Sequence, residues 1–122
     1  GVDLEYISPE AANLRVADRF FSAMEVSALG AVPASRRDEA FFACWTRKEA
    51  FIKARGEGLS MSLDAFSVSL TPGEPAALLS CPGAPDDVRR WSLRSFTPAP
   101  GFVAALAVEG QNWKLVRLTS AP

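Results

Sequence analysis

The sequence predicts an α+β fold in which an antiparallel sheet is packed on one face by a long helix and two short helices. The long helix is predicted over Arg36–Arg55, where apolar residues recur at the spacing of a helix face that packs on a sheet. After Gly56, apolar residues alternate or run continuously between proline and glycine breaks, which is typical of strands. We expect residues 1–122 to form one domain.

Cap residues divide the first half of the chain. Ser8-Pro9-Glu10 has the pattern of a helix N-cap followed by proline at the first helical position. Ser22 and Glu25 have the spacing of a capping box, which predicts the start of a second short helix. Gly56 stands where a C-terminal glycine is expected, so it predicts the end of the long helix.

The second half of the chain is predicted to supply strands, with Cys81–Asp87 as a surface loop. Breaks such as Pro98–Gly101 and Glu109-Gly110 separate its apolar runs. The predicted strands are Ala65–Leu70, Ala76–Ser80, Arg90–Phe96, Phe102–Val108 and Trp113–Leu118.

Composition and charge narrow the class of protein. Hydrophobic residues make up 48% of the chain and charged residues 22%, as in a folded domain, and no apolar run approaches the ~20 residues that cross a bilayer. The net charge of −1 argues against nucleic acid as a partner. Because there is no histidine, Cys44 and Cys81 cannot form a zinc site of familiar spacing or a cysteine–histidine catalytic pair. We expect a cytoplasmic protein with both thiols reduced.

One face of the long helix changes from aromatic to charged along its length. Phe41, Trp45, Glu49 and Lys53 follow one another at intervals of four and therefore lie above one another. Taken alone, Trp45 suits a core position, and Glu49 with Lys53 suits an ordinary helix pair worth roughly 0.2–0.5 kcal/mol. The stripe also places an acid and a base together at the border of the core.

Two further carboxylates occur in the first residues of the chain. Asp3 and Glu5 are two apart in a run with strand character, so both point to the same side of a sheet. On their own they suit solvated positions at a strand end, but packing of strand on helix brings them to Glu49. Magnesium prefers carboxylate oxygens and substrate phosphates, and Lys53 offers a point charge to a phosphate. The sequence therefore predicts a magnesium and phosphate site.

The joint pattern resembles the signature of the 4'-phosphopantetheinyl transferase superfamily. Gly1-Val2-Asp3 is similar to its first part, and Trp45–Lys53, WTRKEAFIK, is similar to its second part after a gap of 41 residues, 4–44. The segments Ala17–Glu25 and Gly56–Val68 are similar to further parts of the family. The likeness covers residues 1–70.

The resemblance implies magnesium-dependent transfer of the 4'-phosphopantetheine arm of coenzyme A to a serine of an acyl, peptidyl or aryl carrier protein. It implies that Asp3 and Glu49 bind the metal directly and that Glu5 binds it directly or through water. Under this resemblance the proton of the acceptor serine would go to Glu49 or to a bound water.

The same resemblance gives roles to other residues. Lys53 would hold the phosphate and steady or protonate the departing nucleotide, while Lys48 and Trp45 would line the pantetheine side. The carrier protein would contact the two short helices at the apolar residues Phe21, Met24 and Leu29, for which core positions are the simpler interpretation.

The spacing Asp3-Leu4-Glu5 resembles the broad-specificity type of the family, the type that activates surfactin synthetase. Members of that type are similar to two half-size domains in tandem with coenzyme A between them, and 122 residues match one half, here the second. Because Asp3 follows so closely on the first residue, we expect a fragment or a processed chain. One alternative is a non-catalytic half domain that binds metal weakly and docks with a missing N-terminal half or with a second copy of itself. Another is an unrelated magnesium-dependent phosphate-binding domain.

Overall fold

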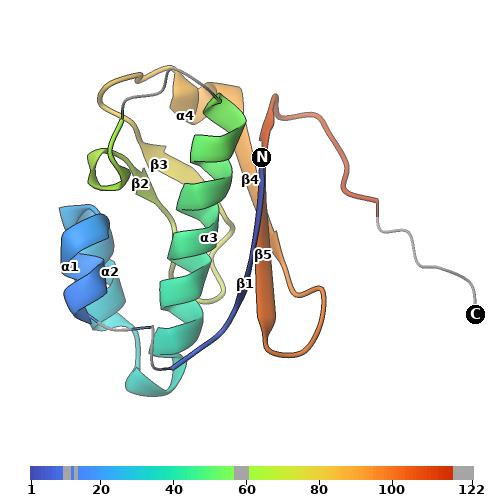
Figure 1. Ribbon diagram of the computed structural model, residues 1–122. Coiled ribbons are helices and arrows are strands. Elements are labelled where there is room, and N and C mark those ends of the chain that lie inside the picture. The colour runs from blue at the N-terminus through green and yellow to red at the C-terminus, as the bar shows by residue number, and fades with distance from the viewer. Residues whose placement is uncertain (10–11, 13, 57–60, 117–122) are drawn as a thin grey trace, which may run out of the picture.

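The computed structural model describes residues 1–9, 12, 14–56 and 61–116. Strands β1, β5 and β4 form an antiparallel sheet in that order, and β2 and β3 form a separate antiparallel pair. Helix α3 packs on the three-stranded sheet, and α1 and α2 lie on the far side of α3 from β1 (Figure 1). In chain order the elements are β1 (Val2–Tyr6), α1 (Leu14–Phe20), α2 (Ala23–Ala31), η1 (Ala34–Arg36), α3 (Arg37–Arg55), η2 (Leu63–Ala65), β2 (Ser67–Val68), β3 (Leu78–Ser80), α4 (Asp87–Arg90), β4 (Trp91–Phe96) and β5 (Phe102–Glu109).

This arrangement confirms the predicted α+β class. The long helix begins one residue later than predicted, after the single turn η1, and ends at Gly56, whose positive φ of 77° suits a residue without a side chain. The capping box of α2 is present: Ser22 N donates to Glu25 Oε1 at 2.8 Å, and Glu25 N donates to Ser22 Oγ at 3.2 Å. Local spacing therefore predicts the start of α2 and the end of α3.

The edge strand β1 has two different faces. Asp3 and Glu5 point toward α3, whereas Val2, Leu4 and Tyr6 are exposed on the outer face of the sheet. On β5, the neighbours of Gly1 and Asp3 on the helix side are alanines, and these residues, Ala107 and Ala105, are fully buried beneath α3. Small side chains at these positions allow the helix to approach the sheet closely.

Gly1 marks the closest approach of β1 to α3. A Cβ atom at this position would lie 2.1 Å from the carbonyl oxygen of Ala50 and 2.6 Å from the amide nitrogen of Ala54. The carbonyl of Gly1 also accepts a hydrogen bond of 2.8 Å from the amide of Ala107 on β5. The glycine of the N-terminal motif is therefore a packing residue that brings Asp3 to the helix.

A buried ion pair joins α2, α3 and β2. The ammonium of Lys48, which is 1% exposed, lies 2.8 Å from Glu25 Oε1 and donates a 2.5 Å hydrogen bond to the carbonyl of Phe66. The second oxygen of Glu25 accepts a hydrogen bond of 2.7 Å from the amide of Val68. The same carboxylate thus caps one helix, neutralises a cation on another and holds a strand.

Several local predictions are wrong or incomplete. Helix α1 begins at Leu14 instead of after Ser8, since Ser8 and Pro9 form only a turn in which Ala12 N donates to Ser8 O at 3.2 Å; Glu10 lies outside the described residues. Strands β2 and β3 are shorter than predicted and form a sheet of their own, with a shift of register between Ser67 and Val68.

The segment after β5 is also different from the prediction. Residues 113–116 form no strand, and the ring of Trp113 lies under the guanidinium of Arg94, with 4.9 Å from Cζ to the ring centroid; residues 117 and 118 lie outside the described residues. The predicted loop Cys81–Asp87 is buried at both ends, and Asp87 begins α4 and lies 3.2 Å from Arg55 Nε. Both cysteines are free and buried. In the part of the chain that the structure describes, no helix is long and apolar enough to span a bilayer.

The contact at Gly1 predicts a loss of stability in the variant Gly1→Ala. We expect the free energy of unfolding to fall by about 1–3 kcal/mol, because the new methyl group meets backbone atoms that cannot rotate away. Urea denaturation followed by circular dichroism measures the change. As a control, Gly30→Ala in α2 meets nothing within 4 Å and is expected to gain up to about 1 kcal/mol. Equal stability of Gly1→Ala and the parent chain would contradict the close contact.

The buried ion pair predicts that Glu25→Gln destabilises the domain by about 3–5 kcal/mol, since it leaves the ammonium of Lys48 enclosed without a counter-charge. The double variant Glu25→Gln/Lys48→Met is expected to recover part of this loss. Glu39→Gln, which removes a carboxylate from an exposed pair with Arg36, is the control and should cost less than about 1 kcal/mol. A loss as small as that of the control would contradict the role of the pair.

Candidate functional site

Four charged side chains from β1 and α3 meet at the border of the core. Asp3 is 7% exposed, and its Oδ1 accepts a hydrogen bond of 2.7 Å from Lys53 Nζ. Lys53 Nζ also donates to the carbonyl of Val2 at 3.2 Å. Glu5 lies two residues along the same face of β1, and Glu49 lies one turn before Lys53 on α3. The structure therefore brings together the residues that the sequence analysis selected from opposite ends of this region.

The electrostatics of the cluster show how close its members are. Burial raises the pKa of Glu49, and the charge of Asp3 raises it further, against a smaller opposite effect of Lys53. Burial likewise raises the pKa of Glu5, as do Asp3 and Glu49, while Lys53 and a hydrogen bond from Trp45 lower it. The pKa of Lys53 is raised mainly by its hydrogen bond to Asp3. Three acids thus repel one another and share a single neighbouring ammonium.

The carboxylate oxygens of Asp3, Glu5 and Glu49 are ligands of the kind that a hard cation prefers. Asp3 Oδ2 is enclosed and has no hydrogen-bond partner, so it is a buried acceptor that a cation would satisfy. Within residues 1–9, 12, 14–56 and 61–116, however, no three acidic, cysteine or histidine side chains already surround a common ion position.

Trp45 connects this cluster to the aromatic core. Its ring lies parallel to that of Phe41, at 7° with centroids 6.5 Å apart, and meets the ring of Phe20 edge-on at 5.8 Å. A hydrogen bond from its side chain helps to lower the pKa of Glu5. Trp45 is half-buried, so one part of the indole packs in the core and another borders the carboxylates.

Lys48 does not lie at this site, contrary to the prediction that it lines the cofactor side. Its ammonium is enclosed with Glu25, which removes it from the surface that a ligand could contact. The sequence held a signal for this position: Phe41, Cys44, Lys48 and Phe51 recur at intervals of three and four, which places Lys48 on the buried face of α3.

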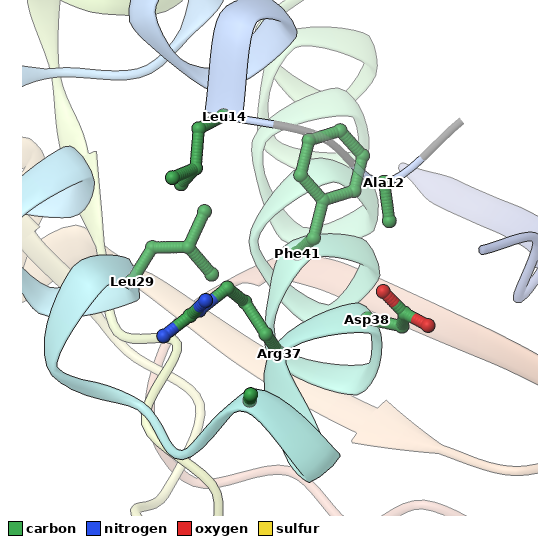
Figure 2. Close-up of a pocket in the computed structure, with 7 residues that line it drawn as sticks. Ala12, Leu14, Leu29, Arg37, Asp38 and Phe41 are labelled. Carbon is green, nitrogen blue, oxygen red and sulfur yellow. The ribbon is translucent and has the colours of Figure 1, made fainter. Parts of the chain in front are cut away.

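A pocket of about 300 Å³ lies between α1, α2 and the first turn of α3 (Figure 2). Of the three apolar residues considered as carrier contacts, Leu29 lines this pocket, Phe21 is buried in the core, and Met24 is 53% exposed. None of the clustered carboxylates lines it. The residues around it are Ala12, Leu14, Leu29, Ala34, Arg37, Asp38 and Phe41.

Two solved structures share this fold. The holo-[acyl-carrier-protein] synthase of Neisseria meningitidis superposes with a TM-score of 0.64 at 19% identity, covering 91% of this chain and 96% of that one. The holo-[acyl-carrier-protein] synthase of Helicobacter pylori, solved in complex with coenzyme A, superposes with a TM-score of 0.59 at 23% identity, covering 90% and 98%. At this level of identity the likeness establishes the fold.

Sequence comparison identifies the family of the chain. Residues 1–107 match the 4'-phosphopantetheinyl transferase superfamily. The 4'-phosphopantetheinyl transferase HetI of Nostoc sp. is 39% identical over 114 residues, which are 93% of this chain and 45% of the relative. The 4'-phosphopantetheinyl transferase Sfp of Bacillus subtilis is 34% identical over 106 residues, 87% of this chain and 45% of the relative. The chain belongs to the 4'-phosphopantetheinyl transferase superfamily, and it spans less than half the length of these relatives.

The shared charge in the cluster predicts that Asp3→Asn lowers the pKa of Glu49 and of Glu5. The pKa of each glutamate in the folded chain lies above its ordinary value of 4.5. Between 4.5 and the raised pKa, the folded chain therefore binds more protons than the unfolded chain. The free energy of unfolding consequently falls as pH rises through this interval. Removing the charge of Asp3 reduces both the pKa shifts and this loss. Carbon-13 NMR titration of the carboxyl groups measures the shifts. Asp38→Asn, in the first turn of α3, is the control that leaves the pKa of Glu49 unchanged; equal effects of the two variants would contradict the proximity.

Proposed function

We propose that this chain carries the catalytic carboxylates of a broad-specificity 4'-phosphopantetheinyl transferase, which moves the phosphopantetheine arm of coenzyme A to a serine of a carrier protein. The meeting of Asp3 and Glu5 on β1 with Glu49 and Lys53 on α3 is the observation that carries the proposal. The names of the relatives and the coenzyme A bound to the Helicobacter pylori synthase support it. The free, buried cysteines suit the reducing cytoplasm, where we place the reaction.

In this proposal Asp3, Glu5 and Glu49 hold Mg²⁺. The metal would supply positive charge beside the pyrophosphate of coenzyme A, where negative charge builds during transfer. The enclosed and unpartnered Oδ2 of Asp3 supports this assignment, because no group among the described residues satisfies that oxygen. The chain's own contribution is a fixed strand–helix contact that keeps the three acids near one another.

Lys53 is suited to hold a phosphate. Its side chain is 50% exposed, so the ammonium reaches solvent while it contacts Asp3. Because the hydrogen bond to Asp3 raises its pKa, Lys53 stays protonated at neutral pH and is a weak proton donor. We therefore assign it the role of steadying the charge of the departing nucleotide, rather than protonating it.

Glu49 is one candidate for the base that accepts the serine proton, and a bound water is the other. Burial and Asp3 raise the pKa of Glu49, which strengthens it as a base, whereas a bound cation would lower the pKa again. Trp45 forms the apolar wall beside these carboxylates and is the residue we assign to the pantetheine arm.

A second candidate function follows from the length of the match. The chain covers 45% of HetI and 45% of Sfp, so residues that hold the rest of coenzyme A can lie in the part of those proteins that the chain does not match. In that case the isolated domain binds metal weakly and docks with the other half or with a second copy of itself, without turnover. The two candidates differ in whether this chain alone transfers phosphopantetheine.

Transfer of phosphopantetheine to an apo carrier protein tests both functions. The first candidate function predicts transfer with Mg²⁺ by the chain alone and also when it is joined to the half of Sfp that it does not match. The second predicts no transfer by the chain alone. Lys53→Met and Glu49→Gln should each lower kcat/KM of the joined protein by about a hundredfold. Glu39→Gln, an exposed glutamate of the same helix, is the control with unchanged activity. Absence of transfer by a folded joined protein would overturn the enzyme proposal.

A further inference from the structure

Arg47 is a buried cation that faces no carboxylate. It lies on α3 and is 7% exposed; its Nε donates to Ser95 Oγ at 2.7 Å, and its Nη1 donates to the carbonyl of Ser69 at 2.6 Å. All these acceptors are neutral, and among the described residues no aspartate or glutamate forms an ion pair with Arg47. Two other cations of α3 differ in this respect, since Lys48 pairs with Glu25 and Arg55 pairs with Asp87.

An enclosed charge without a counter-charge is unfavourable, which makes an unpaired guanidinium an unusual choice for a purely structural contact. A leucine or methionine would fill the same space without the cost of desolvating a charge. In addition, Nη2 of Arg47 donates to no atom of the described residues, so a planar fork with one free arm remains. The free arm is suited to donate a charge-assisted hydrogen bond to one oxygen of a carboxylate or phosphate group.

A cavity of about 460 Å³ opens beside this guanidinium. It lies beyond the open edge of β4, between that strand and residues 74–76, and Arg94 and Ser95 line it together with Arg47. Arg94 is exposed and rests on the ring of Trp113, and it too forms no ion pair within the described residues. Glu74 at the rim is the one acid among the lining residues. Two cations and one acid leave a net positive pocket.

This pocket is separate from the carboxylate cluster. Arg47 and Glu49 are two residues apart on α3, so their side chains leave the helix in nearly opposite directions. None of Asp3, Glu5, Glu49 and Lys53 lines the cavity. A ligand bound at Arg47 therefore does not occupy the site proposed for phosphopantetheine transfer.

We propose that the cavity between Arg47, Arg94 and Ser95 is a second binding site, which takes an oxyanion: a phosphate group or a carboxylate. The free arm of the Arg47 guanidinium donates to one oxygen of the ligand, and Arg94 supplies charge from the rim. The Ser95 hydroxyl, which accepts the hydrogen bond from Arg47 Nε, can donate its own proton to a second oxygen. The site goes beyond the proposed transfer reaction and does not depend on it.

Nitrogen-15 NMR of the arginine side chains tests this proposal on the whole chain. Sodium phosphate and sodium acetate are titrated separately at constant ionic strength while the Nε–H signal of Arg47 is followed. We expect a saturable shift with at least one anion; tighter binding of phosphate assigns a phosphate ligand, and tighter binding of acetate assigns a carboxylate. A small, linear shift shared by all arginines with both anions would overturn the proposal.

Variants at the rim of the cavity keep the core intact and show whether the anion binds at this site. Arg94→Gln should weaken binding by about fivefold, and Glu74→Gln should tighten it by about twofold, because each changes one charge beside the ligand. Arg89→Gln removes the same charge from an exposed pair with Asp86 and is the matched control with unchanged affinity. Lys53→Met should also leave it unchanged, which separates this site from the carboxylate cluster. Equal weakening by Arg89→Gln and Arg94→Gln would show general screening and overturn the proposal.

Discussion

The direct backbone contact between β1 and α3 is the constraint on which the site depends. Gly1 leaves no room for a side chain against Ala50 and Ala54, and the small residues Ala105 and Ala107 let the helix lie close to the sheet. At that distance the hydrogen bond between Lys53 and Asp3 closes at 2.7 Å. A wider gap would leave the carboxylates of the strand and the helix apart and solvated. The carboxylate cluster therefore depends on the small residues Gly1, Ala105 and Ala107 at the contact between strand and helix.

The features that the sequence could predict are those set by local spacing. The capping box of Ser22 and Glu25 and the end of α3 at Gly56 involve residues close together in the chain, and the structure contains both. The direction of Asp3 and Glu5 follows from the alternation of any strand, and the order of Trp45, Glu49 and Lys53 follows from the helical repeat. For the cluster, only the packing of strand on helix had to be assumed, and the family resemblance supplied that assumption.

Other features depend on contacts between distant segments, which spacing does not encode. The spacing of Ser22 and Glu25 predicts a helix cap, but the carboxylate of Glu25 also neutralises Lys48, and its second oxygen holds β2. Trp113 lies in a segment predicted to be a strand, yet that segment forms no strand and the ring of Trp113 contacts the guanidinium of Arg94 on β4. The pairing of β2 with β3 as a separate sheet joins segments ten or more residues apart, and its register shifts between Ser67 and Val68. In each case a tertiary contact outweighs a local preference.

Because β1 lies at the edge of the sheet, the carboxylate cluster can be lost without unfolding of the whole chain. β1 is held by β5 on one side only, and its outer residues Val2, Leu4 and Tyr6 are exposed, although the ring of Tyr6 meets that of Phe102 on β5 edge-on at 5.3 Å. Detachment of this one strand breaks a single ladder and the contact between Asp3 and Lys53, while the aromatic core around α3 persists. Such a sub-global opening needs less free energy than complete unfolding. The working temperature range of the site is therefore narrower than the range over which the helices remain folded.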